Sequence, residues 1–254
     1  MCIIAYRPKG ATLTKKVLKN CYDNNGDGCG IAWPDDKGES MIVERGLFGF
    51  RKLWNIYRDI PKDKPVLLHF RIGTSGQIDE KNCHPFLINE KYALVHNGNI
   101  ENKLGDKDDT LSDTNFFVEK VLRPIFNHPS FKKEEHFWSG FSFKWLMENS
   151  IDTKNKMVIL GADGMATIYN ESAGEWENEV WFSNKTYKED RKSATSSTVE
   201  EYEENGWIKQ VTTFPNNRKV YAWLRPVAKH TEEEIHLQDK ISQLNPQIQI
   251  SELY

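Results

Sequence analysis

The sequence predicts an α+β protein, and three observations support that prediction. Short apolar runs bounded by turn-forming residues, which are typical of strands, recur along the chain. Only a few segments show the 3.6-residue apolar spacing of a helix. Strands and helices do not alternate regularly, as a doubly wound parallel sheet would require. With 254 residues, of which 38% are hydrophobic, the chain can bury a large core.

The first half of the chain contains five expected strands and three expected helices. The strand-like runs are Cys2–Tyr6, Gly30–Trp33, Met41–Val43, Val66–Ile72 and Tyr92–His96. Helical spacing of apolar residues is seen over Leu13–Cys21, Phe50–Ile60 and Thr114–Ile125. The first expected strand therefore begins at Cys2, directly behind the initiator methionine.

The second half continues with strands. The expected strands are Met157–Leu160, Ala166–Tyr169, Val180–Phe182 and Lys219–Leu224, and the Gly-Ala-Asp-Gly sequence at 161–164 offers a hairpin turn between the first two. Residues 188–205 are almost without apolar side chains and are expected to form a polar surface excursion. A strand and a terminal helix are expected within residues 219–244. No linker separates two cores, so we expect one domain over residues 1–254.

Charge and composition exclude several classes of protein. The formal net charge is −3 and the isoelectric point is about 6.2, so the sequence offers no basic surface for nucleic acid or for an anionic membrane. No apolar run approaches the roughly 18–20 residues of a membrane span, and the first residues do not resemble a signal peptide. The four cysteines form no Cys-x-x-Cys pair. We expect a cytoplasmic protein with free thiols and with no disulfide framework or zinc site.

Two glycine-rich or acidic patterns near the start are misleading. Asp23–Gly28 imitates the beginning of a calcium-binding loop, but Pro34 stands where that loop needs a bidentate glutamate. Gly26–Gly30 has the glycine density of a phosphate loop, yet it precedes a strand instead of a helix. The sequence therefore indicates neither a metal nor a nucleotide cofactor.

Cys2 is the first candidate catalytic residue. Removal of Met1 would leave its thiol on the same residue as a free α-amine. A terminal amine with a pKa of about 7.7–8.0 can accept the proton of a thiol directly or through one water molecule, so no histidine is needed. The alternative is an incidental small apolar residue, since free cysteine is usually buried.

Two further strands end in polar residues suited to binding and catalysis. Arg71 ends an apolar strand that enters a glycine-containing loop, where its guanidinium can form two bonds to a carboxylate; the alternative is a structural arginine that caps the loop. Asn97 and Gly98 end the strand that begins at Tyr92. The Asn97 amide and a backbone N–H can donate to one developing oxyanion, although Asn-Gly is also an ordinary turn sequence.

Three other polar residues have strong structural alternatives. Asp113 precedes a predicted helix, so its carboxylate could bind an ammonium group or could cap the helix. His69 and His96 lie inside apolar strands. We interpret both as core histidines and not as catalytic bases.

Together these segments resemble the glutaminase domain of the class II glutamine amidotransferases, which are N-terminal nucleophile hydrolases. The segments that carry the resemblance occur in the family's order over residues 2–184. They are Met1–Cys2, Gly26–Trp33, His69–Gly76, Asn82–Phe86, Leu94–Asn102 and Ser112–Thr114, with Trp181–Asn184 matching a late strand. The resemblance implies a four-layer αββα sandwich.

The resemblance also implies the role of each candidate residue. Cys2 would be the nucleophile, and Asn97 and Gly98 the oxyanion hole. The substrate, glutamine, would be bound by Arg71 at its α-carboxylate, by Thr74 in the pocket and by Asp113 at its α-ammonium group. The sequence departs from the family at Asn24 and Asn115, where fused members often carry arginine and glutamate. No cofactor or metal is implied.

The expected function is glutamine hydrolysis with release of ammonia, for transfer to an acceptor on a separate synthetase subunit. One alternative is a stand-alone hydrolase of the same fold that acts on γ-glutamyl or other amides. Another is an inactive module that binds the ligand without turnover. Neither alternative requires nucleic acid or a membrane.

Overall fold

The computed structural model describes residues 2–72, 80–100, 112–131 and 136–188, together with the strands at 198–204, 207–213 and 219–224. The chain divides into two compact units, Met1–Arg191 and Lys192–Tyr254. The sequence led us to expect one domain over residues 1–254, whereas the structure has two units, with the family-like segments in the first.

The first unit contains a six-stranded antiparallel sheet with the strand order β3-β2-β4-β1-β10-β9. Its strands are β1 (Ile3–Arg7), β2 (Cys29–Pro34), β3 (Met41–Leu47), β4 (Val66–Phe70), β9 (Glu175–Glu177) and β10 (Val180–Phe182). The first strand of the chain is thus central, because β4 and β10 pair with its two edges.

A second antiparallel sheet has the order β5-β6-β7-β8. Its strands are β5 (Phe86–Asn89), β6 (Tyr92–Asn97), β7 (Lys156–Gly161) and β8 (Ala166–Tyr169). The predicted hairpin between β7 and β8 is confirmed: Gly164 has a φ of 87°, in the region that favours glycine, and Gly161 N–H donates to Met165 O at 2.8 Å.

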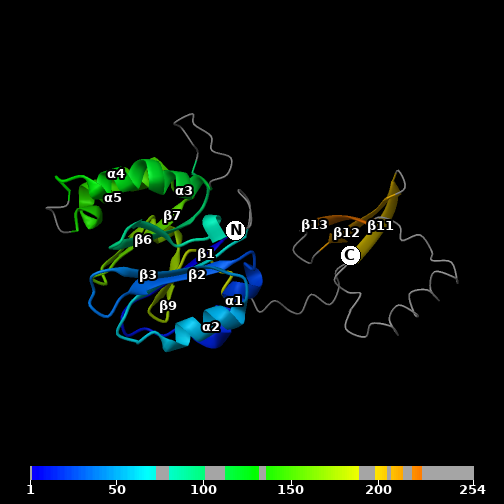
Figure 1. The fold of residues 1–254 in the computed structure, drawn as a ribbon, viewed down its shortest axis with the longest axis horizontal. Helices are drawn as coiled ribbons and strands as arrows, with labels where there is room; N and C mark the ends of the chain where they lie inside the picture. Colours follow the sequence, from blue (N-terminus) through cyan, green and yellow to red (C-terminus); the bar gives the residue numbers. More distant parts are fainter. Residues whose placement is uncertain are drawn as a thin grey trace, which may run out of the picture. The chain divides into compact units, whose positions relative to one another are not determined.

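Helices cover the outer face of each sheet (Figure 1). Helices α1 (Lys15–Asn24) and α2 (Phe50–Asp59) pack on the six-stranded sheet. The four-stranded sheet is covered by a helical segment and a separate helix: α3 (Asp113–Phe117), a π-helical turn (Val118–Leu122) and α4 (Arg123–Asn127), followed by α5 (Phe141–Ile151). Short 3₁₀ turns occupy Glu80–Asn82, Phe137–Ser139 and Glu171–Ala173.

Three hydrophobic clusters confirm that the unit has four layers. One cluster lies between α1, α2 and the first sheet, and includes Ile3 and Phe70. A second lies between the second sheet and its helices, and includes Leu94. The third lies between the two sheets, where Ile4 of β1 and Val95 of β6 are fully buried. The α+β prediction is confirmed, and the layers follow the order αββα.

Several elements differ from the sequence prediction. Strands β5 and β9 were not predicted, because they have only four and three residues and lack a long apolar run. Helix α5 was not predicted either. Its Phe141, Trp145 and Leu146 are exposed, so its apolar residues do not define one face. The strand predicted to reach Ile72 ends at Phe70.

The second unit contains a three-stranded antiparallel sheet of β11 (Thr198–Glu204), β12 (Trp207–Thr213) and β13 (Lys219–Leu224). Strand β11 falls within residues 188–205, where a polar excursion was predicted. Strand β11 pairs with β12 over its full length, so low hydrophobicity did not prevent strand pairing. The predicted strand at Lys219–Leu224 is confirmed, and the predicted terminal helix lies outside the described residues.

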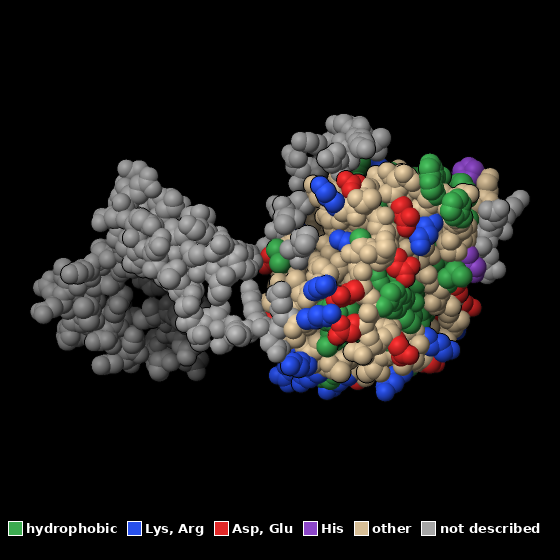
Figure 2. All heavy atoms as spheres, turned by 180° about the vertical axis from the view of Figure 1, so that it is seen from behind, with side chains coloured by type: hydrophobic (Ala, Val, Ile, Leu, Met, Phe, Trp, Pro, Cys, Tyr) green, Lys and Arg blue, Asp and Glu red, His purple; other side chains and the backbone are tan. Residues whose placement is uncertain are grey.

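The surface of the first unit carries charges of both signs. Lysine and arginine side chains lie among aspartate and glutamate side chains on the face shown in Figure 2. Within the described part of the chain, no helix combines the length and apolar character needed to cross a membrane.

Candidate active site

The alternation of side chains along two strands places Cys2 and Asn97 on facing surfaces. On β1, Ile4 points into the layer between the sheets, so Cys2, two residues earlier, lies on the same face. On β6, Val95 points into that layer, and Asn97 follows two residues later. Both candidate residues therefore lie at strand ends that face the space between the sheets.

Cys2 lies next to the end of β4. Its Sγ accepts a hydrogen bond from the backbone N–H of Ile72 at 3.3 Å and lies 3.5 Å from the Ile72 carbonyl. Burial raises the pKa of the Cys2 thiol, while the Ile72 N–H and the positive charge of Arg71 act in the opposite direction. All four cysteines are free thiols, as predicted.

Arg71 lies across from Cys2. The register of β1 and β4 pairs Ile3 with Phe70, so the next step brings Cys2 opposite Arg71. Arg71 is 5% exposed, and its backbone pairs with the segment before β2: Arg71 N–H donates to Gly28 O at 2.9 Å, and Asp27 N–H donates to Arg71 O at 3.0 Å. The Gly26–Trp33 segment therefore holds the backbone of Arg71 in place.

Gly30 allows a close approach behind this site. A Cβ at Gly30 would lie 2.1 Å from the carbonyl oxygen of His84, so a side chain cannot be accommodated without moving backbone. The close contact brings the His84 segment against β2 and β4. It explains in physical terms why glycine stands at this point of the predicted motif.

Three buried histidines lie beside the candidate site. The rings of His69 and His84 are 4.2 Å apart, and those of His84 and His96 are 6.5 Å apart. Burial lowers the pKa of His69 to about 3 and the pKa of His84 well below its usual value. The prediction that His69 and His96 belong to the core is confirmed, since they are 1% and 2% exposed. His84 was not predicted to join them.

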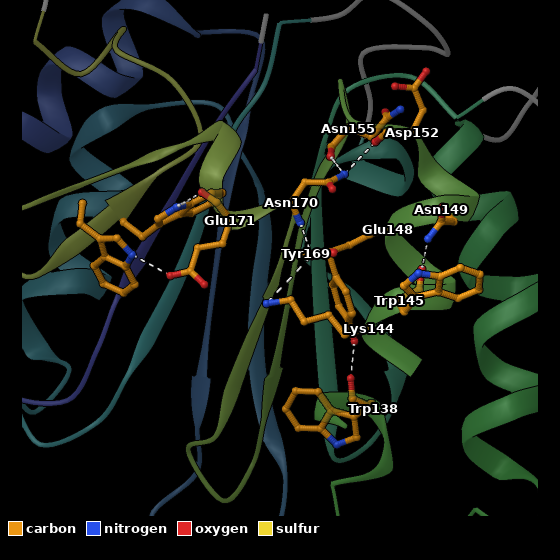
Figure 3. A network of polar contacts seen from close by, with 12 residues as sticks. Trp138, Lys144, Trp145, Glu148, Asn149, Asp152, Asn155, Tyr169, Asn170 and Glu171 are labelled. Carbon is orange, nitrogen blue, oxygen red and sulfur yellow. Dashed lines mark hydrogen bonds and ion pairs between the residues drawn. The ribbon is translucent and has the colours of Figure 1, made fainter. Parts of the chain in front are cut away.

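His96 is held on both sides by hydrogen bonds. Its Nδ1 lies 2.8 Å from Thr114 Oγ1, and its Nε2 lies 2.8 Å from Asn155 Oδ1. The segment that carries Asn155 is fixed by Asn170, whose side-chain amide donates to the carbonyl oxygens of Asp152 and Asn155, both at 2.7 Å (Figure 3). This polar network supports the end of β6 from the helix side.

Asn97 is the last residue of β6, and Gly98 follows it directly. Asn97 is 3% exposed, and its side-chain N–H donates to Ser183 Oγ at 2.8 Å. Gly98 is exposed and has a φ of 153°, near the limit of the region that favours glycine. A Cβ there would lie 2.0 Å from Asn155 Oδ1. The Asn-Gly pair is therefore built into the packing of the second sheet.

Asp113 does not cap helix α3, which corrects one of its two interpretations. The N-cap is Ser112, whose hydroxyl accepts from Asn115 N–H at 3.2 Å and whose own N–H donates to Asn82 Oδ1 at 2.8 Å. Asp113 is the first helical residue. Its Oδ2 accepts from Ile100 N–H at 2.6 Å, so its carboxylate holds the residues that follow Asn97 and Gly98.

The structure thus gathers Cys2, Arg71, Asn97 and Gly98 at neighbouring strand ends and ties Asp113 to the same loop. Thr74 lies outside the described residues, as does Met1. Among the described residues, no group of three or more His, Cys, Asp and Glu side chains is arranged to hold a metal ion.

Two residues in contact with this site had no predicted role. Ser183 contacts Asn97, and the Asn184 side-chain amide donates to the carbonyl oxygen of Cys2 at 2.7 Å. Both follow the last predicted strand of the first unit. The Trp181–Asn184 sequence signalled a strand in the family order, but strand periodicity does not tell which distant strand its polar end will meet.

Comparison with known proteins found a family and a relative that are similar to part of this chain. Residues 13–117 match the model of a family described as glutamine amidotransferases class-II. The chain is 35% identical over 92 residues to a probable glutamine amidotransferase, DUG3, of Saccharomyces cerevisiae, a match that covers 33% of this chain and 25% of the relative. The resemblance recognised from the motifs is confirmed over residues 13–117, which are similar to the class II glutamine amidotransferases, a family of enzymes.

The family match includes Arg71, Asn97, Gly98 and Asp113 and begins after Cys2. A solved structure, the glutamine phosphoribosylpyrophosphate amidotransferase from B. subtilis complexed with ADP and GMP, aligns with 88% of this chain and 49% of its own at 13% identity and a TM-score of 0.43. The chain thus spans about a quarter of the length of the yeast relative and about half of the length of the solved structure.

Proposed function

We propose that the chain hydrolyses glutamine and releases ammonia, with Cys2 as an N-terminal nucleophile. Its thiolate attacks the side-chain carbonyl, and the negative charge that develops on the carbonyl oxygen is held by the Asn97 amide and the backbone N–H of Gly98. The C–N bond then breaks as the amine of Cys2 returns a proton to the leaving ammonia. Water hydrolyses the γ-glutamyl thioester, which yields glutamate and the free thiol.

The observation that carries this proposal is the position of Cys2 among the other groups. Its thiol accepts a hydrogen bond from Ile72 N–H at 3.3 Å, beside Arg71. Asn97 lies on the facing sheet, and Ser183 links it by hydrogen bonds to Ile4, which belongs to the strand that Cys2 precedes. A nucleophile, an oxyanion donor and a cation for a carboxylate are the groups that hydrolysis of an amino-acid amide needs.

The environment of the thiol favours a built-in base. Burial raises the pKa of Cys2, so little thiolate would be present at neutral pH without a proton acceptor. The buried rings of His69 and His84 are engaged in packing against each other. Removal of Met1 exposes an α-amine on Cys2 itself. This amine is a base with a pKa of about 7.7–8.0, and it lies on the same residue as the thiol whose proton it must accept.

The two ends of glutamine require one fixed cation and one fixed anion. We assign the α-carboxylate to the Arg71 guanidinium and the α-ammonium group to the Asp113 carboxylate, with Thr74 in the pocket wall. Asp113 already accepts from the backbone N–H groups of Ile100 and Thr114. A carboxylate has about four acceptor positions, so it can take an ammonium hydrogen as well.

The test combines intact-mass measurement with labelling by a diazo-ketone analogue of glutamine. We expect the purified chain to begin at Cys2, to lose turnover on labelling and to carry one adduct on Cys2. Cys2→Ala should abolish turnover and labelling, whereas Cys21→Ala, which alters a buried thiol in α1, should retain both.

Two results would contradict the mechanism. Full activity with Met1 retained would show that the terminal amine is not the base. The thiol would then have to be activated by a Cys–His pair with His69 or His96. A parent protein that binds glutamine without turnover, and that binds equally well as Cys2→Ala, would identify an inactive binding module.

We further propose that the ammonia passes to an acceptor on a separate synthetase subunit. The family-like residues 2–184, which carry every residue proposed here for glutamine hydrolysis, lie in the first unit. The free thiols fit a cytoplasmic enzyme. Slow glutaminase turnover that rises on addition of a co-purifying synthetase and its acceptor would support transfer. Fast turnover without a partner, especially of larger γ-glutamyl amides, would favour the stand-alone hydrolase.

A further inference from the structure

Ser183 lies at the junction of the two sheets, beside both strands that carry the proposed catalytic groups. It follows the last residue of β10 and is 1% exposed. Strand β10 pairs with β1 in the first sheet, whereas Asn97 ends β6 in the second. The hydroxyl of Ser183 can therefore contact both sheets from one point.

The first set of contacts joins Ser183 to the strand of Cys2. The β1–β10 register pairs Ala5 with Phe182, which brings Ile4 opposite Ser183. Ser183 N–H donates to Ile4 O at 3.1 Å, and Ile4 N–H donates to Ser183 Oγ at 2.9 Å. The side-chain oxygen thus accepts a hydrogen bond that a backbone carbonyl accepts in an ordinary antiparallel pair.

The second contact joins the same oxygen to the proposed oxyanion donor. Asn97 donates one side-chain N–H to Ser183 Oγ at 2.8 Å. A side-chain amide nitrogen has two hydrogens, so one is held by Ser183 and the other is left for a substrate oxygen. Since Asn97 is 3% exposed, its amide lies in a place where a lost hydrogen bond is not replaced by bulk water.

We propose that Ser183 is a positioning residue for amide hydrolysis: its hydroxyl fixes the Asn97 amide relative to β1, the strand that presents Cys2. The inference rests on the proposed function. Ser183 does not touch the substrate and acts through Asn97. An oxyanion donor must be directed at the place where charge develops, and a displacement of about 1 Å can cost roughly a hundredfold in rate.

The kinetic test is a double-mutant cycle between Ser183 and Asn97. Ser183→Ala should lower kcat for glutamine by about tenfold to a hundredfold, with KM within about threefold of the parent value, because the lost group acts in the transition state. Ser183→Thr retains the hydroxyl and should recover part of kcat. In an Asn97→Ala background, Ser183→Ala should cause no further loss. Losses that multiply in the double variant would overturn the proposal.

Each kcat is expressed per active site, titrated with the diazo-ketone analogue, so that a merely destabilised variant does not imitate a slow one. Ser139→Ala is the matched control, because it also removes a serine hydroxyl that makes a hydrogen bond: Ser139 donates to the carbonyl of His136 at 2.8 Å. Ser139 lies in the 3₁₀ turn Phe137–Ser139, outside the strands that carry Cys2 and Asn97. This variant should retain the parent kcat. A normal kcat in folded Ser183→Ala would show a purely structural role.

A spectroscopic measurement tests the geometry even if glutamine is not the substrate. In ¹⁵N-edited spectra of the parent chain, the two side-chain amide proton signals of Asn97 are identified because they are missing from the spectrum of Asn97→Ala. One of its two protons should exchange slowly and lie downfield, and both features should diminish in Ser183→Ala. Two rapidly exchanging protons in the parent would overturn the positioning role, whereas absence of glutaminase activity with this signature present would count only against the proposed function.

Discussion

Gly98 lies directly against Asn155, the residue that also holds the ring of His96. A Cβ on Gly98 would come within 2.0 Å of Asn155 Oδ1 and 2.9 Å of His96 Nε2, while those two atoms are 2.8 Å apart in the structure. The end of β6 is therefore packed so tightly that the backbone N–H of residue 98 has a fixed place beside Asn97.

Gly98→Ala is expected to lower kcat for glutamine by at least about tenfold and to lower the melting temperature. The added methyl group must displace Asn155 or the backbone, and the φ of 153° is unfavourable for alanine. Steady-state kinetics and thermal unfolding measure the two effects. The control is Gly49→Ala, where the Cβ would meet no atom within 4 Å. Equal kinetics for both variants would remove Gly98 from the proposed site.

Arg71→Lys is expected to raise KM for glutamine by roughly one to two decades while the fold is retained. Lysine keeps the charge and loses the planar pair of donors, which weakens a charge-assisted interaction of about 1.5–3 kcal/mol. Titration of initial rates against glutamine concentration measures the change. If the variant unfolds and the folded fraction keeps its KM, Arg71 serves the loop and not the substrate.

Asp113→Asn is expected to raise KM through the ammonium end of glutamine. The amide oxygen can still accept from Ile100 N–H, so the loop contact is retained, while the negative charge and the hydrogen bond from Thr114 N–H are lost. Asp35→Asn is a matched control, because Asp35 Oδ1 also accepts a loop N–H, from Glu39 at 2.9 Å. Parallel rate measurements should show a change in KM for Asp113→Asn alone; an unchanged KM would leave Asp113 only its role in the loop.

The histidine cluster is expected to make the protein sensitive to acid. Burial lowers the pKa of His69 from 6.5 to about 3, so between these values the unfolded chain binds a proton that the folded chain does not. Stability therefore falls as the pH decreases below about 6.5, by up to about 1.4 kcal/mol per pH unit for this one residue. His84 acts in the same direction.

The pH dependence is measured by urea unfolding between pH 7 and pH 4. His84→Phe should make the dependence shallower, since phenylalanine can fill the space between His69 and Phe86 without a titratable group. His128→Phe alters an exposed residue of the second half and should not. Equal slopes for the parent and His84→Phe would show that the buried histidines do not govern acid unfolding.

Most of the local structure around the candidate site could be predicted from the sequence. The apolar runs that end at Arg71 and Asn97 are short and bounded by turn-forming residues, which is typical of buried strands and is a local property of the chain. Helix α5 escaped prediction because its apolar residues do not define one face, and strand β9 because it has only three residues and no apolar run. The alternative that Asp113 caps the helix is wrong by one residue, since Ser112 supplies the capping hydroxyl.

The sequence by itself determined which residues stand at strand ends: Cys2, Arg71, and the Asn97–Gly98 pair, each placed by the short apolar run beside it. Only the tertiary structure decided what those ends meet. Asn184 reaches the Cys2 carbonyl across 182 positions of sequence, and Ser183 reaches Asn97 across 86. These contacts follow from the position of β1 between β4 and β10 and from the stacking of one sheet on the other, and no local propensity encodes either.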